Sequence, residues 1–125
     1  MDENELSNRV IGAAIEVHRV LGPGLLESAY QECLMRELDL RSLPFESEVP
    51  IALDYKGHLV GSAYRADLLV ANKLLVELKT VDRLQPVHTA QLATYLRLMN
   101  RKLGLLINFN VSKLKDGVRR VVYNL

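Results

Sequence analysis

Residues 64–80 read YRADLLVANKLLVELKT. Two short apolar runs, residues 66–70 and 74–78, flank Ala71-Asn72-Lys73. Asparagine tolerates a left-handed backbone, so the three residues between the runs can reverse the chain. The pattern therefore predicts a β-hairpin with a short loop.

The register of this hairpin determines which side chains share a face. A three-residue loop pairs Val70 with Leu74 and, counted back along both strands, Asp67 with Glu77. Because side chains alternate across a strand, Lys79 lies on the same face as Glu77 and Asp67. The opposite face is expected to be an apolar layer made of Ala66, Leu68, Val70, Val76 and Leu78.

Two opposed carboxylates repel unless positive charge lies between them. Lys79 is expected to supply part of that charge, and a divalent cation the rest. Oxygen-only ligation by one or two carboxylates, completed by water and phosphate, suits Mg²⁺, with Mn²⁺ as the substitute. The alternative is an ion-paired, solvated sheet face, which the hairpin alone favours because Glu-x-Lys is a common spacing.

Composition describes one ordinary globular domain, expected over residues 1–125. The chain is 49% hydrophobic and 25% charged, as such domains are. No apolar run approaches the length of a membrane span, and the acidic first residues are unlike a signal peptide, so we expect a cytoplasmic protein without membrane contact. The one cysteine, Cys33, allows neither an internal disulfide nor a thiolate zinc site, and its helical spacing predicts a small core residue.

Charge is unevenly distributed along the chain. The first 54 residues carry eleven acidic and four basic side chains, and the last 29 carry one acidic and seven basic ones. A basic C-terminal third can meet a phosphate backbone. Attraction between acidic helices and basic strands within the fold explains the same asymmetry.

Two periodicities alternate along the rest of the chain. Apolar residues recur at helical spacing over residues 4–21, 26–39 and 86–100. Period-two patterns and turn residues predict strands over residues 45–55, 59–70, 74–80, 103–109 and 118–123. The order ααβββαββ describes a single α/β (α+β) domain with a mixed central sheet and flanking helices.

Several motifs in register resemble a known family. Residues 24–30, GLLESAY, contain the GxxExxY pattern, within AIEVHRVLGPGLLESAYQECL. The chain resembles the GxxExxY protein family through this segment and through YRADLLV, LLVELKT and QLATYL. That family is placed in the PD-(D/E)XK nuclease-like superfamily. The resemblance covers nearly the whole chain and implies a restriction-endonuclease-like core over residues 25–109.

The resemblance also implies roles for individual residues. Asp67 takes the acidic position of the motif, and Glu77 and Lys79 form its (D/E)XK. Ala66, rather than proline, precedes Asp67. RecB-like exonucleases of the superfamily add a glutamate on the preceding helix and a Gln-x-x-x-Tyr on the following one. The residues that match these additions are Glu27, Gln91 and Tyr95.

These assignments give a complete expected site. Asp67 and Glu77 are expected to hold the metal with the Leu78 carbonyl, while Lys79 orients or activates the attacking water. Glu27 is expected to be an outer-shell or second-metal ligand, and stabilisation of its helix N-terminus is the alternative role. Gln91 is expected to orient the water or a phosphate. Supporting residues are Tyr95, Tyr30 and Glu16, of which both tyrosines also fit core packing.

The expected function is hydrolysis of nucleic-acid phosphodiester bonds by metal-activated water, with DNA favoured over RNA and a homodimer as an assembly that the sequence leaves open. Two alternatives remain open from the sequence. One is a non-catalytic module that binds nucleic acid or a nucleotide, and the other is a homo-oligomeric interaction module on the same scaffold. The sequence leaves exonuclease and endonuclease action equally open.

Overall fold

The fold follows the predicted order of elements. A computed structural model describes the backbone of residues 1–125 and the side chains of all of them except residues 62–63. Each helix and strand begins and ends within one residue of its predicted bounds. The elements are α1 (Glu3–Leu21), α2 (Glu27–Leu40), β1 (Phe45–Tyr55), β2 (His58–Val70), β3 (Leu74–Lys79), α3 (Pro86–Met99), β4 (Leu103–Asn108), the 3₁₀ turn η1 (Leu114–Gly117) and β5 (Val118–Val122).

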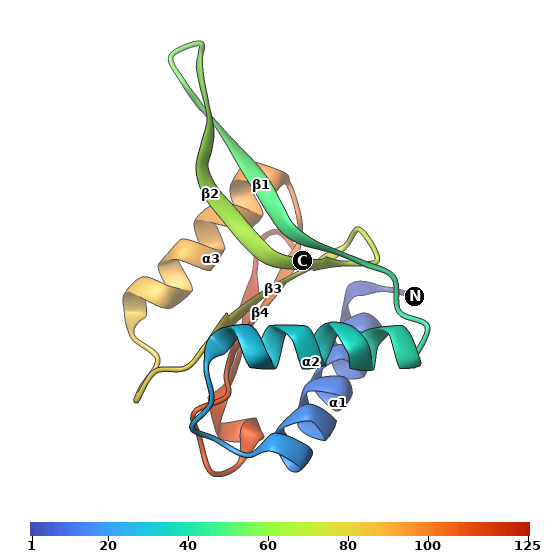
Figure 1. Ribbon diagram of the computed structural model, residues 1–125. Coiled ribbons are helices and arrows are strands. Elements are labelled where there is room, and N and C mark those ends of the chain that lie inside the picture. Colours follow the sequence, from blue (N-terminus) through green and yellow to red (C-terminus); the bar gives the residue numbers. More distant parts are fainter.

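The strands form one mixed sheet in the order β1-β2-β3-β4-β5. β3 and β4 run parallel, and the other neighbours are antiparallel. The crossover between β3 and β4 carries α3, which packs on one face of the sheet, while α1 and α2 lie together on the other (Figure 1). The expectation of a mixed central sheet with flanking helices is confirmed.

The register of the central hairpin is also confirmed. Val70 pairs with Leu74, Leu69 with Leu75 and Leu68 with Val76. Ala71 and Asn72 adopt positive φ angles of 49° and 56°, which turn the chain tightly enough for a three-residue loop.

The prediction of one apolar hairpin face is wrong in two respects. Leu69 and Leu75 lie on the face that carries Glu77, and α3 buries them. Ala66 packs with these residues rather than with Leu68. The change of face lies opposite Glu48 on the neighbouring strand, which has a φ of 51° and stands between two strand pairs. Those pairs are Ser47 with Leu68 and Val49 with Ala66.

Helix α2 buries a narrower stripe than its spacing predicts. Tyr30, Leu34 and Leu38 are fully buried, at intervals of four residues. Cys33 is exposed, so its prediction as a core residue is wrong. Position 33 is one residue, or about 100° of helix rotation, away from the buried stripe.

The far half of the β1–β2 hairpin projects beyond the helices as an arm (Figure 1). The register shifts between Ile51 and Leu53, where three residues of β2, from Gly61 onward, oppose a single residue of β1. Gly61 thus lies at a bulge. Among the residues described above, no helix is both long and apolar enough to cross a membrane.

Candidate functional site

The carboxylates of Asp67 and Glu77 are held side by side by reciprocal hydrogen bonds between β2 and β3. The Asp67 backbone N–H donates to Glu77 Oε1 at 2.9 Å. The Leu78 backbone N–H donates to Asp67 Oδ2 at 2.7 Å. Each carboxylate is therefore oriented by the opposite strand, and the geometry follows from the three-residue loop.

Burial makes this pair unfavourable without added positive charge. Glu77 is only 6% exposed. Burial, followed by the charge of Asp67, raises the pKa of Glu77 to about 8. Burial also raises the pKa of Asp67, against the lowering effects of the Leu78 N–H and of Lys79. A solvated, ion-paired sheet face would instead keep both carboxyl groups exposed and easily ionised.

Glu27 and Lys79 belong to the same group of charges. Glu27 is the first residue of α2 and is half-buried. Burial, followed by the charge of Asp67, raises the pKa of Glu27, while Lys79 opposes this effect. Lys79 lowers the pKa of Glu77 as well. The fold thus brings together the three acidic residues and the lysine that the sequence singled out.

Glu48 is a further acidic residue of this group, and sequence reasoning missed it. Its charge raises the pKa of both Glu27 and Asp67. Its Oε1 accepts a hydrogen bond from Gln31 Nε2 at 3.0 Å, and the same amide reaches the Asp67 carbonyl at 3.3 Å. The one signal for Glu48 in the sequence was its acidic side chain on the predicted strand 45–55, next along the chain to the strand of Asp67.

Gln91 and Tyr95 lie on α3 at the edge of the site. Tyr95 is 4% exposed. Burial, followed by the charge of Glu77, raises its pKa, so its phenol lies near the carboxylates. Gln91, one helical turn earlier, is exposed and lines a hollow with Tyr95 and Tyr64.

The expected supporting residue Tyr30 is built into the core. Its ring is fully buried and stacks on Phe109 at 4.5 Å between ring centroids. Its hydroxyl donates to the Gly22 carbonyl at 2.5 Å and accepts from the Leu25 N–H at 3.2 Å. Tyr30 therefore fixes the corner between α1 and α2, and through it the start of the helix that carries Glu27.

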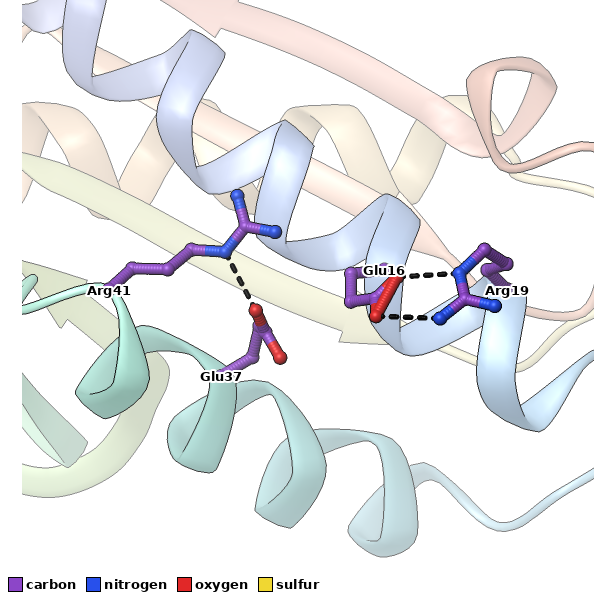
Figure 2. Close-up of polar contacts among 4 residues, drawn as sticks. All are labelled: Glu16, Arg19, Glu37 and Arg41. Carbon is purple, nitrogen blue, oxygen red and sulfur yellow. Dashed lines mark hydrogen bonds and ion pairs between the residues drawn. The ribbon is translucent and has the colours of Figure 1, made fainter.

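Glu16 does not join the carboxylate group. Its side chain forms a two-point ion pair with Arg19 on the surface of α1, with 2.6 Å between Oε1 and the arginine Nε (Figure 2). This hydrogen bond lowers the pKa of Glu16. A second pair, Glu37 with Arg41, lies at the other end of the view and ties α2 to its own C-terminus.

The donor set fits a hard divalent cation that keeps part of its water shell. Within the described part of the chain, no three His, Cys, Asp or Glu side chains gather closely enough to enclose a metal ion. Asp67 and Glu77 offer oxygen ligands held in fixed orientation. Mg²⁺ is commonly held by one or two carboxylates, with water and phosphate completing its shell.

Comparison with known proteins identifies the family. The model of the PD-(D/E)XK nuclease superfamily matches residues 4–121. The crystal structure of SSO0001 has the same fold, with a TM-score of 0.60 and 22% sequence identity. The match covers 78% of this chain and 50% of that protein, so the chain spans half the length of its structural relative. The comparison with curated proteins gave no match. The chain belongs to the PD-(D/E)XK nuclease superfamily.

Proposed function

We propose that this protein is a Mg²⁺- or Mn²⁺-dependent nuclease that hydrolyses phosphodiester bonds in nucleic acid. The observation that carries the proposal is the carboxylate pair, in which Glu77 is buried and Asp67 is partly buried. Asp67 and Glu77 are each oriented by a backbone N–H of the opposite strand, and burial raises the pKa of both. Such a pair gains free energy when a cation binds, because the cation offsets both the burial and the mutual repulsion.

Asp67 and Glu77 would hold the metal, with the Leu78 carbonyl as a further oxygen donor, while Glu27 would act from farther away, through a metal-bound water or a second cation. The bound cation would supply Lewis acidity toward a phosphoryl oxygen and a lowered pKa for its water. Lys79 lies close enough to lower the pKa of three neighbouring carboxyl groups. Its ammonium group would orient the attacking water and stabilise negative charge developing on the phosphorane. The exposed amide of Gln91 would orient the water or a substrate phosphate.

The proposed substrate is DNA in preference to RNA, and the proposed assembly is a homodimer. The four acidic residues of the site would repel the phosphate groups of a nucleic acid. Basic side chains elsewhere on the surface are therefore needed to bind its backbone. The exposed Arg119 and Arg120 on the edge strand β5 are part of the basic C-terminal third. Analytical ultracentrifugation measures the oligomeric state. Cleavage rates on DNA and RNA strands of the same sequence measure the substrate preference.

Calorimetry with Mg²⁺ and then Mn²⁺ tests the metal site directly. We expect saturable binding by the wild type and its loss in Asp67→Asn, which keeps the shape of the side chain but removes its charge. Asp39→Asn, at the exposed C-terminal end of α2, is the matched control and should bind as the wild type does. Cleavage of end-labelled DNA and RNA is then assayed with the same three proteins.

Two outcomes count against the proposal. Absence of metal binding in folded wild-type protein would remove its basis. Metal binding with no cleavage of any single- or double-stranded substrate would favour the alternative of a non-catalytic nucleic-acid or nucleotide-binding module.

A further inference from the structure

A hollow of about 350 Å³ lies beside the carboxylate pair, between β2 and α3. Its volume falls within the roughly 300–1,000 Å³ typical of small-ligand sites. Tyr64 forms the β2 side, and Val87, His88, Gln91 and Tyr95 form the α3 side, together with Ala90 and Thr94. Tyr95 connects the hollow to the site, because its phenol lies near Glu77.

The lining includes two tyrosine rings and carries no acidic or basic side chain apart from His88, as far as the described residues go. The rings of Tyr64 and Tyr95 lie 5.7 Å apart between centroids and are tilted by 54°. Tyr95 is buried, whereas Tyr64 is 38% exposed and leaves part of its ring open to the hollow. An open aromatic ring in an uncharged hollow suits a flat, neutral ligand better than a phosphate group.

Polar groups at the α3 side suit the edge of such a ligand. The His88 Nδ1 accepts the Gln85 N–H at 2.9 Å, which leaves the ring proton on Nε2 as a donor. The amide of Gln91 offers both donors and an acceptor, so it can contact a base edge and still orient the water or a phosphate. A nucleobase has this combination of an aromatic face and a polar edge.

We propose that the hollow binds one unpaired base of the substrate strand, with Tyr64 as its stacking surface. The proposal rests on the function proposed above and adds that the substrate has an unpaired nucleotide next to the phosphate being cleaved. Tyr64 precedes Asp67 by three residues on the same strand, or about 10 Å at strand spacing. A base on Tyr64 therefore belongs to a nucleotide near the phosphate that reaches the carboxylates.

This placement selects against intact duplex. A paired base is stacked between its neighbours, and moving it into a side pocket requires breaking its pairing and stacking. A single strand or a frayed end offers the base without that cost. The protein should therefore bind single strands, and duplexes with unpaired ends, more tightly than blunt duplex.

Fluorescence anisotropy with a fluorescein-labelled single-stranded DNA tests the proposal, in Ca²⁺ buffer so that binding is measured without cleavage. We expect Tyr64→Leu to weaken binding about 5- to 150-fold, the range for loss of one base–aromatic stack. Tyr64→Phe, which keeps the ring, should bind within about twofold of the wild type. Tyr55→Leu is the matched control, because Tyr55 is 62% exposed on the same arm and is not part of the hollow.

A second readout locates the base. A strand carrying 2-aminopurine at one position at a time should lose fluorescence at a single position with wild-type protein, and not with Tyr64→Leu. Equal affinity of the wild type and Tyr64→Leu for the single strand would overturn the proposal. It would also be overturned if Tyr55→Leu weakened binding as much as Tyr64→Leu does, or if the wild type bound blunt duplex as tightly as single strand.

Calorimetry on the same proteins separates this proposal from the proposed nuclease function. Tyr64→Leu should bind Mg²⁺ as the wild type does, because Tyr64 offers the metal no ligand. If the wild type bound no metal but still bound single strands through Tyr64, the nuclease function would fail and the base site would stand. If metal binding and cleavage were normal but independent of Tyr64, only the base site would fail.

Discussion

Glu77→Gln should change how the stability of the metal-free protein depends on pH. Burial, followed by the charge of Asp67, raises the pKa of Glu77 from 4.5 to about 8 in the folded protein. Between these two values the folded protein holds a proton that the unfolded chain has already released. Unfolding then releases a proton, so the free energy of unfolding falls as the pH rises.

The size of this effect follows from the shift. One proton released on unfolding changes the free energy of unfolding by about 1.4 kcal/mol for each pH unit. From pH 5.5 to 7.5, inside the window, the wild type should therefore lose about 2 to 3 kcal/mol. Glutamine has nearly the same shape, and its Oε1 can still accept the Asp67 N–H, but it carries no titrating proton. The variant should be more stable than the wild type at pH 7.5.

Urea denaturation in EDTA at several pH values measures the difference, with Asp39→Asn as the control for loss of a carboxylate elsewhere. Adding Mg²⁺ at pH 7.5, at a concentration of one hundred times its dissociation constant, should raise the free energy of unfolding by about 2.7 kcal/mol, and should do so in the wild type only. Equal pH slopes in the wild type and Glu77→Gln would refute the reasoning, because they would mean that Glu77 titrates alike in the folded and unfolded chains.

Three other predictions concern the site and its support. Mg²⁺ binding should release close to one proton near pH 7 and almost none at pH 9, because a cation displaces the proton that Glu77 holds below pH 8. Calorimetry in two buffers of different ionisation enthalpy counts these protons, and release of none at pH 7 would contradict the raised pKa of Glu77. Tyr30→Phe removes the hydroxyl that joins the Gly22 carbonyl to the Leu25 N–H and should cost about 1 kcal/mol or more of stability in urea, while Mg²⁺ affinity stays within a few-fold of the wild type. Gly117→Ala should destabilise the fold by at least about 2 kcal/mol, because the added Cβ would lie 2.2 Å from the Asn108 carbonyl oxygen; an unchanged urea midpoint would show that the turn before β5 can open.

Local sequence signals were sufficient to predict the central part of the site. The loop at Ala71-Asn72-Lys73 has a fixed length, and loop length sets the register of a hairpin. Once the register is known, the opposition of Asp67 and Glu77 requires no tertiary information. Helix and strand bounds were equally accessible, since periodicity and the turn residues that interrupt it are local properties.

The errors all involve tertiary context. Nothing in the local sequence marks Glu48 for a positive φ, and opposite it Ala66 and Leu68 lie on opposite faces of the sheet. Cys33 has the hydrophobicity and spacing of a core residue, but the width of the buried stripe on α2 depends on how that helix packs. Glu16 is close to the Gly-Pro-Gly corner in sequence, and yet Arg19 pairs with it on the surface.

The carboxylate pair is costly to the fold, and this cost is itself an argument about function. A solvated sheet face would leave Glu77 exposed beside Lys79, with a pKa at or below its usual range. Glu77 is instead 6% exposed, with its pKa raised to about 8. Two backbone N–H groups hold the two carboxyl groups side by side, where both cannot ionise without repulsion. The proposed cation would turn this unfavourable arrangement into a favourable one, at the orientation that the hairpin has already imposed.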